Sequence, residues 1–228
     1  CLCMACGGND SKDYWGDTSG GEDEEPTENP NASKPRYIWI DAAANFPDFA
    51  NSKENIARDL ALAKDAGFTD IVVDVRPTTG DVLFKTNLVD QVKFMYAWIG
   101  SNYTKVERTA TWDYLQAFVD EARKQGLRIH AAINTFVGGN QIDGGTGLLY
   151  RDQSKAEWAT QMNMQVGITS VMNTSESTKF FNPAHPEVQT FLCDLLKDLA
   201  GYDLDGIFLD RGRFLNLQAD FSDESRKQ

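Results

Sequence analysis

Two short segments of this chain end an apolar run in residues that can do chemistry. The run 71–75 leads into Arg76, and the run 206–209 leads into Asp210. Near-continuous apolar runs of this length are typical of buried parallel strands. Enzymes built as (β/α) barrels carry their catalytic groups at the carboxyl ends of such strands. An arginine and a carboxylate at these two positions therefore predict an active site that works through carboxylate chemistry.

Asp210 is the predicted catalytic residue. Hydrolysis of a glycosidic bond uses two carboxyl groups, of which one is ionised and one protonated. Arg211 and Arg213 lie one and three residues after Asp210, and a neighbouring arginine stabilises an ionised carboxylate. The alternative is a structural ion pair at the end of a strand. Asp205 stands at the start of the same strand, and we interpret it as a cap or turn residue.

Polar residues also stand at or near the ends of the other predicted strands. Their recurrence at successive strand ends is the argument for a shared site, because each of them alone is more often a satisfied loop residue. A core role is the alternative for His130, which lies inside its strand. The predicted substrate-binding residues are Asp41, Arg76, Asp81, His130, Asn134, Asn182 and Arg213.

Other kinds of catalytic site have weak support. The two histidines, His130 and His185, have no acidic cluster beside them in the sequence, so no metal site is predicted. The glycine-rich segments 138–140 and 144–147 lack the strand-to-helix context of a phosphate-binding loop. No cofactor is predicted, and no serine stands in a nucleophile-elbow pattern.

Strands and helices alternate along the chain from residue 37. Strands are predicted over 37–41, 69–75, 127–134 and 205–210. Helices are predicted over 53–66 with a cap at Asn51 or Ser52, over 111–125 with a cap at Thr111, over about 155–165, and from Pro183 to about 199. This alternation predicts parallel strands with right-handed crossovers, in either a doubly wound sheet or a barrel.

The long insertions, 76–109 and 135–181, decide between these two architectures. Both follow strands and not helices, which places them on the face where barrel active sites are built. The predicted fold class is therefore α/β, a (β/α)8 TIM barrel of which about the first four βα units are present. Residues 36–228 form the N-terminal half of this glycosidase-like barrel, and a further helix is expected near residues 220–226.

Residues 1–35 have a different character. The segment Cys1–Cys6 resembles the end of a lipoprotein signal peptide, with Cys6 as the residue to be lipidated. The rest is rich in Gly, Ser, Asn, Pro and acidic residues. Eight acidic residues stand against Lys12 and Lys34, a net charge of −6 out of −12 for the whole chain. Such a composition predicts a disordered tether between a lipid anchor and a domain.

Composition bounds the partners. The 228 residues are 41% hydrophobic, enough for one core, and the net charge of −12 excludes a nucleic-acid binder that needs a basic patch. No stretch of about 18 apolar residues is present, so membrane association is expected only through the lipid anchor. The expected location is the cell envelope, as an outer-membrane lipoprotein, and the expected partner is a carbohydrate.

Four segments resemble motifs of one known family in order and spacing. They are 68–81, 126–134, 182–188 and 202–210 with Arg213, and they are similar to the glycosyl-hydrolase-like family 10. The resemblance implies an amylase-like TIM barrel and a glycosidase, with Asp210 at the nucleophile position and a general acid near the end of the fifth strand. Two features depart from the family pattern. A second threonine, Thr79, extends the turn after Arg76, and Phe208 replaces a polar residue two positions before the acid.

The leading hypothesis is a glycoside hydrolase that acts on a polysaccharide or peptidoglycan glycan at the cell envelope. The alternative is a non-catalytic carbohydrate-binding surface lipoprotein on a degenerate barrel. A polysaccharide deacetylase would require a His/Asp metal cluster, which the sequence does not indicate.

Overall fold

The computed structural model describes residues 34–227, and the chain divides into the units Cys1–Pro35 and Arg36–Gln228. The predictions for the lipidated Cys6 and for almost all of the acidic segment 1–35 lie outside the described residues. Within the described part, no helix is both long and apolar enough to cross a membrane.

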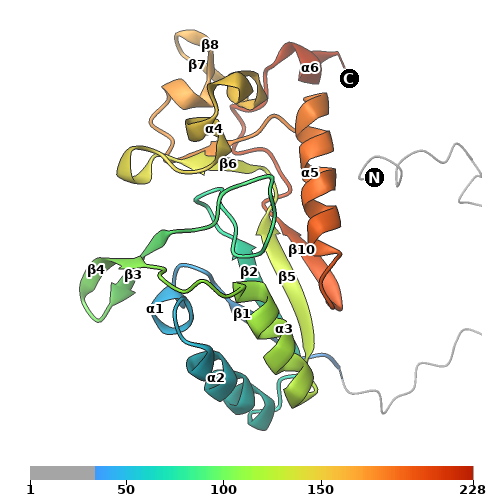
Figure 1. The fold of residues 1–228 in the computed structure, drawn as a ribbon. Coiled ribbons are helices and arrows are strands. Elements are labelled where there is room, and N and C mark those ends of the chain that lie inside the picture. The colour runs from blue at the N-terminus through green and yellow to red at the C-terminus, as the bar shows by residue number, and fades with distance from the viewer. Residues whose placement is uncertain (1–33, 228) are drawn as a thin grey trace, which may run out of the picture. The chain divides into compact units, whose positions relative to one another are not determined.

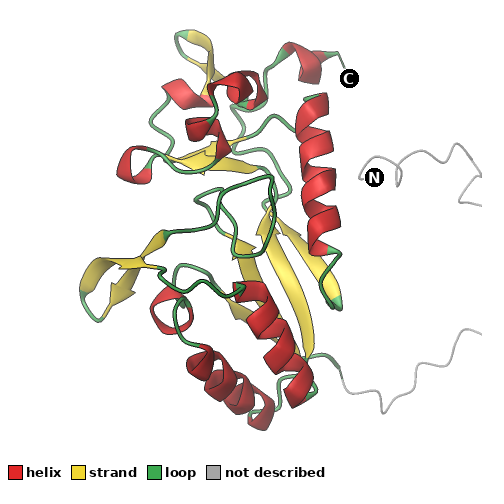
Figure 2. Cartoon of the chain, in the orientation of Figure 1, coloured by secondary structure: helices red, strands yellow, loops and turns green. Residues whose placement is uncertain are grey.

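A four-stranded parallel sheet organises residues 36–227 (Figures 1 and 2). Its strands are β1 (Tyr37–Ile40), β2 (Asp70–Arg76), β5 (Arg128–Asn134) and β10 (Gly206–Asp210). They pair in the order β1-β2-β5-β10, so each new strand adds to the same edge. A doubly wound sheet reverses this progression at a switch point. The observed order is that of a barrel and agrees with the predicted fold.

Three helices connect these strands. They are α2 (Lys53–Asp65), α3 (Tyr114–Gln125) and α5 (Pro186–Leu199). Ser52 caps α2 by accepting a hydrogen bond from a backbone N–H, as predicted. The cap of α3 is Asp113 and not the predicted Thr111, and Gly126 ends that helix with a positive φ of 64°. Thr111 lies two residues too early because the backbone becomes helical only at Tyr114.

The helices cover one face of the sheet with a continuous apolar core. Strand residues on this face, such as Ile71, Val73 and Ile133, are almost fully buried. They belong to one cluster with helix residues such as Leu60 and Phe118. Successive side chains of a strand point to opposite faces, and the helices α2, α3 and α5 pack on the face that carries these apolar side chains.

The other face of the sheet carries rings and no helix. Tyr37, Trp39, His130 and Phe208 contact one another there, with ring centroids 5.6–6.0 Å apart. Trp39 remains 45% exposed and Phe208 37% exposed. Parallel sheets are ordinarily covered on both faces. In a closed barrel this face is the packed interior.

The insertions form structure of their own. Between β2 and α3 lies an antiparallel hairpin of β3 (Phe94–Ile99) and β4 (Asn102–Glu107). After β5 comes a lobe beyond the carboxyl ends of the strands (Figure 1). Its elements are β6 (Val137–Asn140), η1 (Ile142–Gly144), α4 (Leu148–Arg151), η2 (Gln153–Trp158), β7 (Gln161–Met164), β8 (Gly167–Ser170), η3 (Val171–Asn173) and β9 (Thr178–Phe180). Two short helices, α1 (Phe46–Phe49) and α6 (Asp223–Arg226), complete the list.

The helix predicted over 155–165 is wrong. The chain there forms the short η2 and then β7, which pairs with β8. The apolar residues Met162 and Met164 fit both the spacing of a helix and the alternation of a strand. Hydrogen bonding to residues 167–170 makes this segment a strand. The further helix near 220–226 is present as α6, capped by Ser222.

A substitution at Gly206 tests the packing of the inward face. A Cβ atom at this position would lie 2.8 Å from Nδ1 of His130, whose ring is held from several sides. We expect Gly206→Ala to lower the free energy of unfolding by about 1–3 kcal/mol in a chemical denaturation experiment. Gly212→Ala is the matched control, because its nearest neighbour is a backbone oxygen at 3.4 Å. Equal stability of the two variants would contradict close packing on this face.

Candidate active site

Polar residues gather at the carboxyl ends of all four parallel strands. Asp41 follows β1, Arg76 ends β2, Asn134 ends β5 and Asp210 ends β10. Asn134 and Asp210 are direct neighbours in the sheet register. The predicted recurrence at successive strand ends is therefore present in three dimensions.

Asp210 is an exposed carboxylate, as Asp41 is. One of its oxygens accepts a hydrogen bond from the backbone N–H of Arg211 at 2.7 Å, and its own carbonyl accepts one from Thr135 at 2.7 Å. Arg211 has a positive φ of 48°, which is unusual for a residue with a side chain. Backbone conformations of this kind concentrate at functional sites. The turn fixes the direction of Asp210 while leaving its side chain exposed.

The arginines after Asp210 do not pair with it in the described residues. Arg213 donates to the carbonyl oxygens of Phe214 and Leu215, both at 3.1 Å, and its side chain is exposed. The structural ion pair that was the alternative role for Asp210 is thus not formed. Arg213 lies in the loop beside the strand end, and its predicted contact with a substrate stays a prediction.

Asp74 is a site residue that the sequence analysis missed. It lies in β2 and is 7% exposed, with its Oδ1 accepting a hydrogen bond from the backbone N–H of Arg76 at 3.2 Å. Burial raises the pKa of this carboxyl to about 7, and the nearby Asp41 carboxylate and, more weakly, Asp210 raise it further. The available signal was one acidic residue inside an otherwise apolar strand.

Asp41 is the exposed partner in this arrangement. Its Oδ1 accepts a hydrogen bond from the backbone N–H of Ala44 at 2.7 Å, which closes the turn after β1. The same loop supplies a backbone hydrogen bond to Asp74 from Ala42. Asp41 and Asp210 therefore act on Asp74 electrostatically across the strand ends, and both favour the protonated form of Asp74.

Arg76 is fully buried and acts on the backbone. Its Nη1 donates to the carbonyl of Asn134 at 2.5 Å and to that of Thr135 at 3.3 Å, and its Nη2 donates to the carbonyl of Val137. Asn134 in turn donates to the carbonyl of Arg76 at 2.9 Å. Burial lowers the pKa of the guanidinium to about 10. The predicted role of Arg76, direct contact with a substrate, does not fit this geometry, because no part of its side chain reaches the surface.

Asp81 and Asn182 also have structural partners. Asp81 is buried and forms a two-fold ion pair with Arg151 of α4, with both distances 2.5 Å. Burial raises the pKa of Asp81, while the hydrogen bond and charge of Arg151 oppose that rise. Asn182 is buried and donates to Ser222 at 2.9 Å, which ties the start of the α5 region to α6. Asp81 and Asn182, predicted to contact substrate, thus hold parts of the fold together in the structure.

His130 lies in the middle of β5, away from the strand ends. Its Nε2 is 2.9 Å from Oδ1 of Asp70, and the same carboxylate binds Arg128 through two hydrogen bonds of 2.7 Å. The ring packs between Tyr37 and Phe208. The Arg128 hydrogen bond holds the pKa of Asp70 far below its usual range. The alternative of a core role describes His130 better than a substrate contact.

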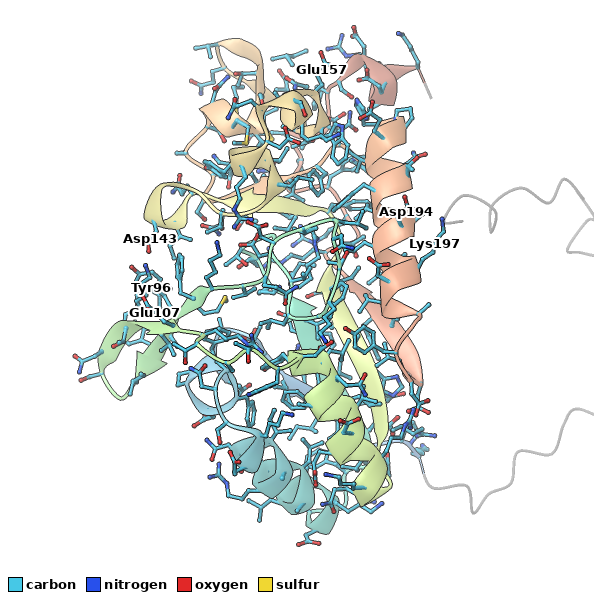
Figure 3. The ribbon with its side chains drawn as sticks, in the orientation of Figure 1. Tyr96, Glu107, Asp143, Glu157, Asp194 and Lys197 are labelled. Carbon is cyan, nitrogen blue, oxygen red and sulfur yellow. The ribbon has the colours of Figure 1, made fainter. Side chains whose placement is uncertain are left out.

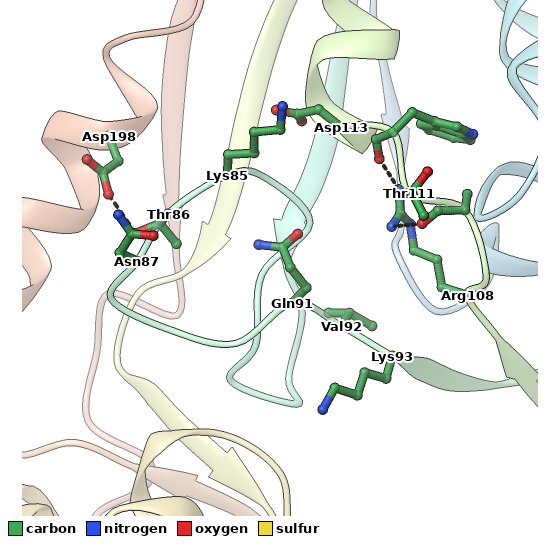
Figure 4. A pocket seen from close by; sticks show the side chains of 12 residues that line it. Lys85, Thr86, Asn87, Gln91, Val92, Lys93, Arg108, Thr111, Asp113 and Asp198 are labelled. Atoms are coloured by element: carbon green, nitrogen blue, oxygen red, sulfur yellow. Dashed lines mark hydrogen bonds between the residues drawn. The ribbon is translucent and has the colours of Figure 1, made fainter.

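The cavities separate into those near the strand ends and those away from them. The largest, about 690 Å³, lies between the loop 85–93 and the segment before α3, and includes Arg108 and Asp198 (Figure 4). It contains none of the predicted site residues. A smaller cavity of about 350 Å³ is lined by residues of the loops after β1 and β2, including Ala43 and Thr79. No group of metal-binding side chains occurs in residues 34–227.

Comparison with known proteins identifies the family. Residues 34–224 match the family described as Glycosyl hydrolase-like 10. The chain belongs to the glycosyl hydrolase-like 10 family. A curated relative, an S-layer-related protein of Niallia circulans, is 32% identical over 192 residues. That alignment covers 82% of this chain but 12% of the relative, so the chain spans a small part of that protein's length.

Solved structures support the fold of this glycosyl hydrolase-like chain. α-L-Fucosidase isoenzyme 2 from Paenibacillus thiaminolyticus is similar with a TM-score of 0.56 and 18% identity, over 86% of this chain and 26% of that one. A hypothetical protein from Ruminiclostridium thermocellum gives a TM-score of 0.52 and 15% identity, over 82% and 81% of the two chains. The predicted family and the predicted partial barrel are thereby confirmed.

The protonation of Asp74 predicts a pH-dependent stability. Its folded-state pKa of about 7 lies above the unfolded value of about 4, so the folded protein is favoured below pH 4 and loses this advantage as the pH rises through 7. We expect Asp74→Asn to raise the melting temperature on the order of 5 °C at pH 8, and to change it little at pH 4. Thermal unfolding at both values measures this.

Asp194→Asn serves as the control for that measurement, because Asp194 lies on the outer side of α5 and pairs with Lys197 (Figure 3). A gain from Asp74→Asn that is equal at pH 4 and pH 8 would show that the carboxyl does not titrate in this window.

Proposed function

We propose that this protein is a glycoside hydrolase whose nucleophile or transition-state stabiliser is Asp210. The observation that carries the proposal is the exposed Asp210 carboxylate, oriented by its own turn at the end of the fourth parallel strand. Family membership supports a glycosidase-like function. A glycosidase needs one ionised carboxylate beside the anomeric carbon and one carboxylic acid beside the leaving oxygen. Asp210 supplies the first of these.

In this proposal the second carboxyl group comes from the end of a fifth barrel strand, an element not found among residues 34–227. Asp74 is the proton-bearing acid closest to this role in the present chain, but it is almost fully buried. It is better suited to shape the charge of the site than to donate to a leaving group. Asn134 is the neighbour of Asp210 in the sheet register, and it exchanges two hydrogen bonds with Arg76. These bonds fix the strand end beside which a sugar would bind.

The proposed substrate is a polysaccharide or a peptidoglycan glycan at the cell envelope. The name of the Niallia circulans relative, S-layer-related protein, supports a cell-surface setting. Lipid attachment at Cys6 would hold the protein in the envelope, and the acidic segment that follows would be the tether. Both belong to this proposal, as does the outer-membrane location.

A non-catalytic carbohydrate-binding surface protein is the second candidate. The observation that favours it is Phe208, two residues before Asp210, which packs its ring against Trp39 and Tyr37. A polar side chain at this position would orient the acid, whereas a phenyl ring offers it no hydrogen bond. Binding without cleavage is the outcome that this candidate predicts.

Glycan hydrolysis by the full-length protein tests the proposal. Product release would be measured from peptidoglycan strands with and without peptides, and from plant and host polysaccharides. We expect Asp210→Asn to lower the rate roughly a thousandfold or more, because the amide cannot act as a nucleophile or stabilise positive charge.

Asp194→Asn, an exposed carboxylate on α5, is the matched control and should retain the wild-type rate (Figure 3). Cleavage that is equal in the Asp210→Asn variant and the wild-type protein would remove Asp210 from the mechanism. Binding with no cleavage by either protein would favour the carbohydrate-binding candidate.

A further inference from the structure

The β3–β4 hairpin presents aromatic rings on one of its faces. Trp98 pairs with Tyr103 across the hairpin, and Tyr96 is two residues from Trp98, so the three side chains share a face. The Tyr96 and Tyr103 rings are stacked with centroids 5.4 Å apart, and the Trp98 and Tyr103 centroids are 5.3 Å apart. The opposite face buries Met95 and Ala97 against the body of the protein. The hairpin is therefore fixed by one face and displays the other.

These rings are far more exposed than a packing role requires. Trp98 is 68% exposed and Tyr103 is 56% exposed. A contiguous exposed apolar patch on a folded protein marks a binding surface more often than a single exposed residue does. The hairpin projects from the rest of the chain on the same side as the loop that carries η1 (Figure 1).

Asp143 of η1 holds the aromatic face in place. It accepts a hydrogen bond from the Tyr96 hydroxyl at 3.0 Å and one from Lys105 at 2.6 Å, and Figure 3 shows Tyr96 and Asp143 facing each other. The Lys105 ammonium also lies 3.9 Å from the centre of the Phe94 ring. The charges of Lys105 and Asp143 compensate each other, so Lys105 leaves no unpaired positive charge on this face.

A cavity with both apolar and polar side chains in its walls adjoins the rings. Its volume is about 350 Å³, in the range of small-ligand sites, and Tyr96 and Tyr103 form one wall. The other walls carry amides and hydroxyls from Thr78, Gln141 and Ser177. The side chains of these three residues have no hydrogen-bond partner among the described residues, so they are available to a ligand.

We propose that the aromatic face of the hairpin and this cavity bind a neutral segment of a glycan chain. The inference rests on the proposed function and deepens it, because it assigns a sugar-binding surface on the carboxyl-terminal side of the barrel strands. The C–H edges of a pyranose carry partial positive charge and complement the negative faces of Trp98 and Tyr103. Its hydroxyls complement the amide of Gln141 and the hydroxyls beside it.

The chemistry of the surface argues against other ligands. A phosphorylated or strongly anionic ligand requires uncompensated cations, and Lys105 is already paired with Asp143. An apolar partner would bury the cavity's amides and hydroxyls without hydrogen bonds, which is unfavourable. A polyhydroxylated, uncharged chain satisfies both the rings and the polar walls.

Native affinity electrophoresis of the full-length protein tests this surface. Soluble glycol chitin, an uncharged polymer of N-acetylglucosamine, xylan and galactomannan would each be embedded in a separate gel. We expect at least one of them to retard the wild-type protein, and Trp98→Ala and Tyr103→Ala to weaken the affinity on the order of tenfold. Ile99→Ala is the matched control, since Ile99 is 48% exposed on the opposite face of the same hairpin.

Binding and hydrolysis can fail separately in this design. Retardation of Ile99→Ala equal to that of the wild-type protein, together with loss in the two aromatic variants, supports the inference. Wild-type affinity in Trp98→Ala and Tyr103→Ala overturns it, even where Asp210 proves essential for cleavage. Absence of retardation by all three polysaccharides also overturns it. Tyr103→Phe, which keeps the ring, should bind within about twofold of the wild-type protein and excludes a folding defect.

Discussion

The buried guanidinium of Arg76 is the interaction on which the site depends. It joins the end of β2 to the chain segment after β5 through the carbonyls of Asn134, Thr135 and Val137. A buried charge is tolerated only where hydrogen bonds and opposite charge replace water. The carbonyl dipoles supply the first, and the Asp81 carboxylate supplies the second. Because Asn134 is the register neighbour of Asp210, the position of the candidate nucleophile follows from this contact.

The unequal faces of the sheet explain the arrangement of the rest. One face is closed by α2, α3 and α5 over a dry core, and the other carries the ring cluster of Tyr37, Trp39, His130 and Phe208. Gly206 lies beside His130 because a side chain there would collide with the imidazole. Large and small residues thus alternate between neighbouring strands on the inward face, as they do in layered barrel interiors. The polar residues begin where these layers end.

The apolar runs and helix periods predicted the four parallel strands and three crossover helices because short apolar runs bounded by turn residues, and apolar residues at helical spacing, are strong local signals. The same reasoning located Asp210 and Asn134 at adjacent strand ends. Sequence reasoning could not show that Asp81, unlike these two residues, has an ion-pair partner, because that partner, Arg151, lies 70 residues away in the sequence. The β7 strand was missed because its pairing with β8, and not its own pattern, determines its conformation. Asp74 was read as part of an apolar run, and only the three-dimensional proximity of Asp41 shows its unusual charge state.

Ionisation of the Asp74 carboxyl is unfavourable at these strand ends. Asp74 is buried and has the Asp41 carboxylate nearby, so its pKa is raised to about 7. Retention of the Asp74 proton limits the negative charge beside Asp210, which remains exposed to solvent and to any substrate. Carboxyl groups whose environments differ in this way can take different roles in one site. The burial of Asp74 therefore leaves Asp210 and Asp41 as the exposed carboxyl groups at the strand ends, and under the proposed function Asp210 is the one that would act on a substrate.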